Sequence, residues 1–322
     1  MSTASAPNRN KPSTTATLVV AFASLYFFWG STYTAIRVGV AEMPPLLYAG
    51  ARFVIAGGIL LAICRARGLR LVWPPRDMML TALVGLFLLS GSNVSLVYAE
   101  QTVPSGLASL ILAAIPLLIA VAEMLLPGGE PLPARGWVGL ALGFVGLAVL
   151  LSPSLRSGFG GDWARLFAIG VLLSGALCWT AGSLVGRRAR LRMNSFVGAA
   201  WQMLAAGLVN LALGSALAEW PHFHPTHRGL FALAYLVVGG SLLGYTSFVY
   251  LIERVPIAKV ASYAYVNPVV AVLLGITLLG ERPAGAEFAG MAAILVAVFL
   301  LTTSQVRAKK AAPEELEQLP AD

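Results

Sequence analysis

The stretch VPSGLASLILAAIP runs from Val103 to Pro116, and the stretch VPIAKVASYAYVNP runs from Val255 to Pro268. Both begin with Val-Pro and end with a proline after the same interval, so the chain carries one apolar, proline-marked segment twice. The second copy adds a lysine, two tyrosines and an asparagine. A duplicated segment that is polar in only one copy predicts two structural repeats that are chemically unequal.

The duplication extends along most of the chain. Trp29 to Arg37 corresponds to Trp179 to Arg187 at an offset of 150 residues. The offset stays between 150 and 152 for the other matched positions, which are Tyr98 with Tyr250, Pro104 with Pro256, Pro116 with Pro268, Glu130 with Glu281, and Gly139 with Gly290. Such a steady offset indicates two copies of one unit.

The composition is that of a membrane protein. Hydrophobic residues make up 58% of the 322 residues and charged residues 11%, whereas a soluble domain has about 45 to 50% and about 25%. The net charge of +8 does not indicate nucleic-acid binding, because the basic residues lie between apolar runs and form no patch. Cys64 and Cys178 are far apart and lack metal-ligand spacing, so we expect neither a disulfide framework nor a zinc site.

Ten apolar runs are long enough to cross a bilayer, which takes about 20 residues. We place spans near 15–36, 45–64, 77–99, 104–126 and 135–151, and near 163–186, 195–218, 228–252, 257–279 and 285–304. The prediction is an all-α integral membrane protein with a first repeat at 15–151, an external linker at 152–162 and a second repeat at 163–304. The first run is too long for the core of a signal peptide, so we expect it to be retained. The polar ends, 1–14 and 305–322, are expected to be disordered cytoplasmic tails.

Lysine and arginine determine the predicted orientation, because positively charged loops stay on the cytoplasmic side. With the N-terminus inside, fifteen of these residues lie in inner loops and tails and five in outer loops, while Arg52 and Lys259 lie within spans. We therefore expect a multi-pass protein of the plasma (inner) membrane with both termini cytoplasmic. Because each copy has five spans, an odd number, the second copy is inverted relative to the first. Inverted repeats around a central site are the architecture of many secondary transporters.

Five stretches carry a family resemblance: FFWGSTYTAIRVGV (27–40), PPLLYAGARFVIAGGILL (44–61), YAEQTVPSGLASLILAAIPLL (98–118), SYAYVNPVVAVLLG (262–275) and LLGE (278–281). They resemble the EamA family of the drug/metabolite transporter superfamily. Each motif is loose, but their order, spacing and duplication together are specific. The resemblance implies ten helices in two inverted five-helix repeats and the export of amino acids, other metabolites or toxic compounds.

Six side chains are the candidates for a substrate site: Trp29, Asn93, Trp179, Tyr245, Tyr263 and Asn267. Trp29 and Trp179 correspond through the duplication, and each either lines a cavity or only packs helices. A buried carboxamide without a partner costs about 1 to 3 kcal/mol, so Asn93 and Asn267 each need an interhelical hydrogen bond, a water or a substrate. Tyr263 lies one turn before Asn267 on the same helical face. We expect a substrate with one polar end and one apolar or aromatic end, which is neutral, zwitterionic or a weakly charged amphipath and not a multivalent cation.

Four further residues are candidates for structural or gating roles: Arg52, Pro116, Lys259 and Pro268. A charge inside the membrane is a functional hypothesis by default, but the favoured interpretation of Arg52 is structural, with carbonyl groups, Glu42 or Glu100 as partners. Lys259 lies near the cytoplasmic surface, where its long side chain can snorkel to the interface. The matched prolines bend their helices, which would let the repeats rock.

Other polar residues give weaker indications. Glu100 and Glu123 are candidates for a proton-coupling carboxylate, although both can also reach an interface from a span end. The histidines of HFHPTH (222–227) have loose metal-ligand spacing in a short outer loop, and we expect no metal there. No cofactor is implied, and proton coupling stays open.

A membrane-embedded enzyme and a non-transporting receptor or scaffold subunit are the alternatives to a transporter. The chain has no H-E-x-x-H, no paired intramembrane aspartates, no nucleophile elbow and no phosphate-binding G-x-x-x-x-G-K-[ST], so zinc hydrolysis and ATP-driven pumping lack the residues they need. A receptor would need neither the inverted duplication nor the matched prolines. The sequence predicts a transporter with a small-molecule substrate and the lipid bilayer as partners, and it leaves the oligomeric state open.

Overall fold

A computed structural model describes residues 15–127, 133–159, 162–189, 191–252, 254–255, 260 and 262–317. Helices joined by short loops make up these residues, and they contain no strand. The first repeat contains α1 (Thr15–Val40), α2 (Pro45–Ala66), α3 (Pro75–Gly85), the π-helix η1 (Leu86–Ser92), α4 (Asn93–Ala99), α5 (Ser105–Leu112), α6 (Ile115–Leu125) and α7 (Ala134–Phe159). α3, η1 and α4 form one continuous span, and α5 and α6 form the next. Pro116 near the start of α6 accounts for the break after α5, because proline has no N–H to donate to the Leu112 carbonyl.

The second repeat follows the same order. It contains α8 (Trp163–Arg188), α9 (Ser195–Ala216), the short 3₁₀ helix η2 (Trp220–His222), α10 (His227–Tyr235), the π-helix η3 (Leu236–Tyr245), α11 (Thr246–Ile252), α13 (Tyr263–Leu279) and α14 (Gly285–Glu317). α10, η3 and α11 form one continuous span. Both repeats therefore place a π-helix in the middle of their third span.

These elements confirm the predicted fold class of ten membrane helices. Within the described residues, eight helical spans have the length and hydropathy to cross a bilayer, and Tyr263–Leu279 and Gly285–Leu301 are shorter apolar helices. α7 extends beyond the span end predicted at 151, and α14 continues through 305–317, a segment expected to be disordered. Alanine, lysine and glutamate in that segment all favour helix. Residues 1–14 and Lys259 lie outside the described residues.

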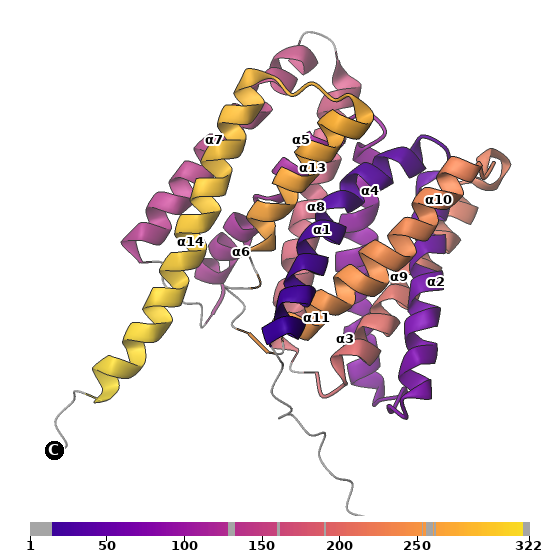
Figure 1. The fold of residues 1–322 in the computed structure, drawn as a ribbon, viewed down its shortest axis with the longest axis horizontal. Coiled ribbons are helices and arrows are strands. Elements are labelled where there is room, and N and C mark those ends of the chain that lie inside the picture. The colour runs from indigo at the N-terminus through magenta and orange to yellow at the C-terminus, as the bar shows by residue number, and fades with distance from the viewer. Residues whose placement is uncertain are drawn as a thin grey trace, which may run out of the picture.

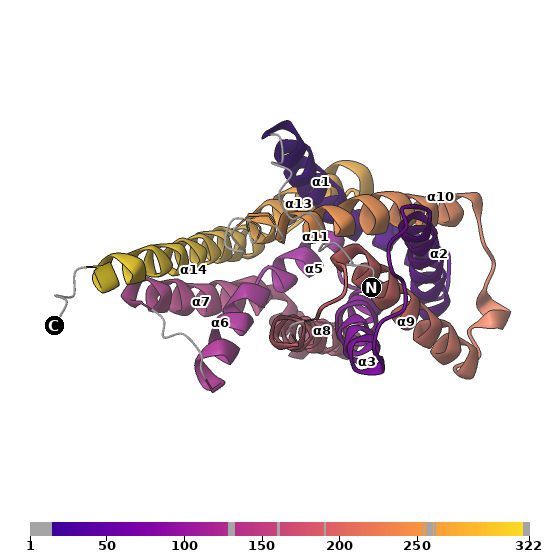
Figure 2. The same cartoon turned by 90° about the horizontal axis from the view of Figure 1, so that it is seen from below.

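Corresponding helices of the two repeats pack against each other at both flanks of the bundle. α7 and α14 run side by side at one flank, and α2 and α9 pair at the other (Figures 1 and 2). Small residues allow the α7–α14 contact, because a Cβ added to Gly139 would lie 3.0 Å from the Ala297 carbonyl oxygen and one added to Gly146 would lie 2.9 Å from the Ala293 Cβ. Close approach of this kind is a common way for membrane helices to associate.

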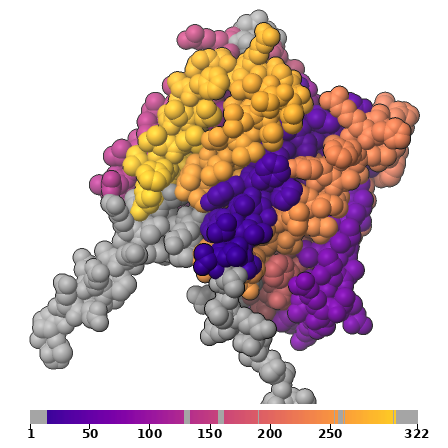
Figure 3. All heavy atoms as spheres, in the orientation of Figure 1, coloured from indigo at the N-terminus to yellow at the C-terminus, as the bar shows by residue number. Residues whose placement is uncertain are grey.

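The central helices make contacts that are equivalent through the duplication. α1 packs against η3 and α13 of the second repeat, and α8 packs against η1 and α6 of the first. The space-filling view shows α1 lying between α13 on one side and α10 and α11 on the other (Figure 3). This exchange of partners is what a pseudo-two-fold relation between inverted repeats requires.

The orientation in the membrane stays a prediction. Reporters fused after Arg192 and after Lys310 are expected to be cytoplasmic, and a reporter in the loop 222–227 is expected to be external. The reason is that most Lys and Arg residues lie in loops and tails on the same predicted side of the membrane as positions 192 and 310. Alkaline phosphatase and fluorescent-protein fusions measure the two sides. A cytoplasmic signal from the 222–227 loop would contradict the assignment.

Candidate functional site

A cavity of about 110 Å³ lies between the two repeats. Its described lining comes from α1, α2, η1, α4, α5, α6, α8, α9, η3 and α13. The six predicted site residues all line it, namely Trp29, Asn93, Trp179, Tyr245, Tyr263 and Asn267. Arg52, Pro116 and Pro268 line the same cavity, whereas Lys259 lies outside the described residues. The sequence therefore identified residues that the fold brings together from both repeats.

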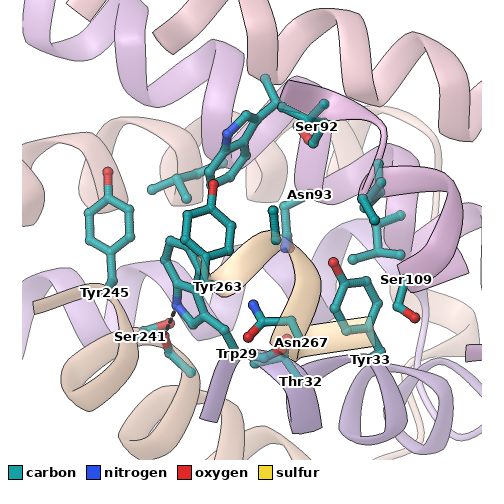
Figure 4. A pocket seen from close by; sticks show the side chains of 18 of the residues that line it. Trp29, Thr32, Tyr33, Ser92, Asn93, Ser109, Ser241, Tyr245, Tyr263 and Asn267 are labelled. Atoms are coloured by element: carbon teal, nitrogen blue, oxygen red, sulfur yellow. Dashed lines mark hydrogen bonds between the residues drawn. The ribbon is translucent and has the colours of Figure 1, made fainter. Parts of the chain in front are cut away.

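Trp29 is the centre of the aromatic wall of this cavity. Its ring meets Tyr263 edge-on at a centroid distance of 5.1 Å and Trp179 edge-on at 6.0 Å, and it lies 5.0 Å from Phe248. The indole N–H donates to the Gly240 carbonyl at 3.3 Å (Figure 4). Trp29 thus both packs helices of the two repeats together and presents an aromatic surface to the cavity.

The polar atoms of the cavity are not fully satisfied by the protein. Asn267 is 5% exposed, and its Oδ1 has no hydrogen-bond partner among the described residues. The Oδ1 of Asn93 and the Nη1 of Arg52 are unpartnered in the same sense. The Asn93 side chain points toward Asn267, and the Asn267 carboxamide points toward Trp29, with Tyr33 and Thr32 beside it (Figure 4). Buried amide and guanidinium groups normally find partners, so these atoms are available to a ligand or to water.

Arg52 is buried, and its partner is a serine. Its Nε donates to the Ser241 Oγ at 3.0 Å, which joins α2 to η3, and its guanidinium carbon lies 4.9 Å from the centroid of the Phe53 ring. Among the described residues, neither acid suggested from the sequence pairs with it. Glu42 accepts a hydrogen bond from Thr226 at 2.9 Å instead, and the carboxyl oxygens of Glu100 have no partner in the described part of the chain.

The two π-helices, which sequence periodicity did not reveal, shape the polar side of the site. η1 ends beside Asn93, and η3 contains Ser241 and Tyr245. Glycines in η3 leave room for the site residues, because a Cβ on Gly240 would lie 2.8 Å from the Arg52 Nη2 and one on Gly244 would lie 2.5 Å from the Trp29 Cδ1. π-Helical turns are frequent at functional sites. Clustered glycines in the sequence mark η3, whereas η1 contains only Gly91.

Carboxylates from distant segments cap helices at the end of the bundle that is predicted to be external, here called the outer end. α5 follows Pro104, which has no side-chain acceptor for the first amides of the helix. Glu281, beyond α13, accepts from the amides of Ser105 and Gly106 at 2.7 and 3.0 Å and from the Ser105 hydroxyl at 2.8 Å. Glu219 caps α2 in the same way. These caps hold the two repeats together at the outer end.

Two inverted repeats that enclose a cavity with both aromatic and polar walls define the chain as a membrane transporter by architecture. The chain belongs to the EamA-like transporter family, whose family model matches residues 16–152 and 166–303. The resemblance drawn from the sequence motifs is thereby confirmed, and both copies of the duplication are EamA units.

Three relatives of this chain are named as transporters or as an efflux pump. The chain shares 40% sequence identity with the "Uncharacterized inner membrane transporter YedA" of Escherichia coli strain K12, and the alignment covers 87% of this chain and 88% of the relative. It shares 31% identity with the "Uncharacterized transporter YvbV" of Bacillus subtilis, with 94% of this chain and 95% of the relative aligned. It shares 28% identity with a "Probable amino-acid metabolite efflux pump" of Salmonella typhimurium, with 84% of this chain and 90% of the relative aligned.

The fold also matches a solved structure. A protein crystal structure superposes with a TM-score of 0.66 and 24% sequence identity, covering 90% of this chain and 99% of the other. This likeness shows the fold alone.

Proposed function

We propose that this protein is a secondary transporter of the inner membrane that exports small zwitterionic metabolites with an apolar or aromatic side group. The observation that carries the proposal is the chemistry of the central cavity. Among its described lining residues, Arg52 is the one charged side chain, and no carboxylate faces the cavity. A guanidinium, two carboxamide oxygens and an aromatic wall suit a solute that carries both charges and an apolar group.

Each part of such a solute has a matching protein group. A carboxylate would bind the free Nη1 of Arg52, since guanidinium and carboxylate form strong charge-assisted hydrogen bonds. An ammonium would donate to the Oδ1 atoms of Asn93 and Asn267 and lie near the face of Trp29. The apolar group would contact the aliphatic wall that Leu112, Ala113, Ile115 and Met203 form.

Movement would follow from the prolines at matched positions in the two repeats. α5 and α6 are interrupted near Pro116, and α13 contains Pro268 at the matched position, so both repeats have a site that can bend beside the cavity. Rocking of one repeat against the other would expose the cavity first to one side and then to the other. The names of the Escherichia coli and Salmonella relatives support the inner-membrane location and the direction of export.

The proposal is tested by transport in vesicles that contain the purified protein. A thermal-shift screen of amino acids, nucleosides and cationic drugs first identifies solutes that bind, because a ligand of the folded state raises the unfolding temperature. Counterflow of the labelled solute in proteoliposomes then measures transport against protein-free vesicles. Binding without any movement of solute would favour a receptor, and chemical conversion of the solute would favour an enzyme.

A substrate class follows from the charge of the cavity. Neutral aromatic or aliphatic amino acids are expected to raise the unfolding temperature and to be transported, whereas a dication such as a polyamine is not, because Arg52 repels cations and no carboxylate among the described lining residues attracts them. Robust polyamine transport that is unchanged by Arg52→Ala would contradict this expectation.

A further inference from the structure

Glu100 has a buried carboxyl group that the proposed function does not use. The residue directly follows α4, it is 0% exposed, and neither carboxyl oxygen has a hydrogen-bond partner among the described residues. Arg37 donates to the backbone carbonyl of Glu100 and not to its carboxyl group. An ionised carboxylate that is buried without a partner is strongly unfavourable, and such a group becomes neutral by binding a proton.

Charged and titratable side chains from three parts of the fold interact electrostatically with Glu100. α1 contributes Arg37 and Tyr33, α2 contributes Tyr48, and the segment after α13 contributes Glu281. Tyr33 also lines the central cavity, while Arg37 and Glu281 line a second cavity at the outer end. Glu100 therefore lies between the central cavity and the outer end of the pathway.

The remaining charged residues of this region are engaged elsewhere or lie farther out. At the start of α8, Asp162 accepts from the Arg165 amide at 3.1 Å, and the Arg165 guanidinium lies 3.7 Å from Glu287. Arg228 at the start of α10 lines the outer cavity together with Glu281. None of these contacts supplies a partner to the carboxyl group of Glu100 within the described residues.

The two acids near the outer end have opposite surroundings. Glu281 accepts three hydrogen bonds from the first residues of α5, whereas the carboxyl oxygens of Glu100 have no partner among the described residues. Burial raises the pKa of Glu100 well above its usual value, the nearby charge of Glu281 raises it further, and Arg37 lowers it. Glu100 is therefore the acid of this pair that holds a proton when the outer end is closed.

We propose that Glu100 is the binding site for the proton that drives this transporter, and that the outer end closes when the Glu100 carboxyl group is protonated from the external side. The role of the proton in driving export rests on the proposed function. The link between protonation and closure concerns the protein alone and does not depend on the identity of the solute.

The direction of the effect follows from linkage. The carboxyl group binds its proton more tightly when buried than when water reaches it, so proton binding favours the closed form. The stabilisation of the closed form by the bound proton is complete below the usual glutamate pKa of about 4.3. It is lost as the pH rises through the raised pKa that Glu100 has in the closed form. The proton would pass from external water to the Glu100 carboxylate and then to cytoplasmic water. It would therefore move into the cell in exchange for the solute that is exported.

The test measures how fast a membrane-impermeant maleimide, added outside, reaches a cysteine beneath the outer end. Ser109 on α5 lines the central cavity and is 1% exposed, so Ser109→Cys reports opening. Ala41→Cys, at an exposed position of the outer cavity, corrects for the pH dependence of thiol reactivity. Both are placed in a Cys64→Ala/Cys178→Ala background, which removes the two native cysteines. The ratio of the two labelling rates is expected to rise about threefold or more from about pH 5 to about pH 9.

Two variants assign the pH dependence. Glu100→Gln imitates the protonated carboxyl group, so its labelling ratio should stay low at every pH. Glu42→Gln is the matched control, because Glu42 is a half-exposed acid at the same end that accepts from Thr226, and its pH dependence should equal that of the parent. A flat ratio in the parent protein, a pH-dependent ratio in Glu100→Gln, or a flat ratio in Glu42→Gln would overturn the proposal. A flat ratio in the parent protein overturns the proposal even if Glu100→Gln does not fold.

Transport separates this inference from the proposed function. In vesicles with an imposed pH gradient, gradient-driven accumulation of a labelled neutral aromatic amino acid should fall about tenfold or more in Glu100→Gln, while exchange of the same solute continues. Accumulation equal to that of the parent would overturn the role of Glu100 and leave the transporter proposal standing. A parent protein that moves no solute would overturn the proposed function, and the labelling ratio would still decide whether protonation closes the outer end.

Discussion

Replacing Arg52 with methionine is expected to weaken the binding of a neutral aromatic amino acid by about 10- to 100-fold. A hydrogen bond to a charged group contributes about 1.5 to 3 kcal/mol, and about 1.4 kcal/mol corresponds to a tenfold change in affinity. The Nη1 of Arg52 is buried and has no partner among the described residues, so a solute carboxylate would bind it without displacing a protein contact. Methionine keeps an apolar side chain of similar length against Phe53. Calorimetric titration of the purified variant measures the change.

Two controls separate recognition from packing. Ser241→Ala removes the hydrogen bond from the Arg52 Nε that joins α2 to η3, but it leaves the guanidinium in the cavity, and its affinity should stay close to that of the parent. The carboxamide of the same amino acid lacks the anionic group, so Arg52→Met should change its binding little. Equal losses for the acid and the amide would show that Arg52 acts only by holding the helices in place.

The fold could be predicted from the sequence because both of its determinants are patterns of residue type along the chain. Apolar runs of span length fix the number of helices, and the offset of 150 to 152 residues fixes how they are grouped. Trp29, Asn93 and Asn267 could be selected as site residues because aromatic and carboxamide side chains are conspicuous inside apolar helices. The duplication then indicated that Trp29 and Trp179 would meet, as they do at 6.0 Å.

Contacts between distant segments were not accessible in this way. The sequence gives no indication that Glu281 caps α5, because a carboxylate in a loop shows nothing of the amides it will meet. The sequence suggests backbone carbonyls, Glu42 or Glu100 as partners of Arg52, yet its Nε donates to the hydroxyl of Ser241 across the interface of the two repeats. The π-helices likewise depend on packing of η1 and η3 against α8 and α1, and this packing leaves no periodic signal in the sequence.

Alanine at Asn267 or at Tyr263 is expected to weaken the binding of the same amino acid by about 1 kcal/mol or more, which is about fivefold. The Asn267 Oδ1 is buried, unpartnered and aimed into the cavity (Figure 4), so it would lose a hydrogen bond to the solute ammonium. Tyr263 places its ring edge-on against Trp29 at 5.1 Å, and its loss would leave Trp29 free to move away from the solute. Calorimetric titration gives both affinities, and membrane yield with a single size-exclusion peak shows that the variants fold.

The apolar copy of the repeat supplies the matched control. Ile115 lies 152 residues before Asn267, lines the same cavity and is 8% exposed. Ile115→Ala removes apolar contact at an equivalent position without removing a polar group, so it should weaken solutes with large side groups while leaving the preference for an amino acid over its uncharged analogue intact. Asn267→Ala should instead reduce that preference. If Asn267→Ala and Tyr263→Ala both bind the amino acid with the parent's affinity, the polar copy does not recognise the solute, and the difference between 103–116 and 255–268 is one of helix packing alone.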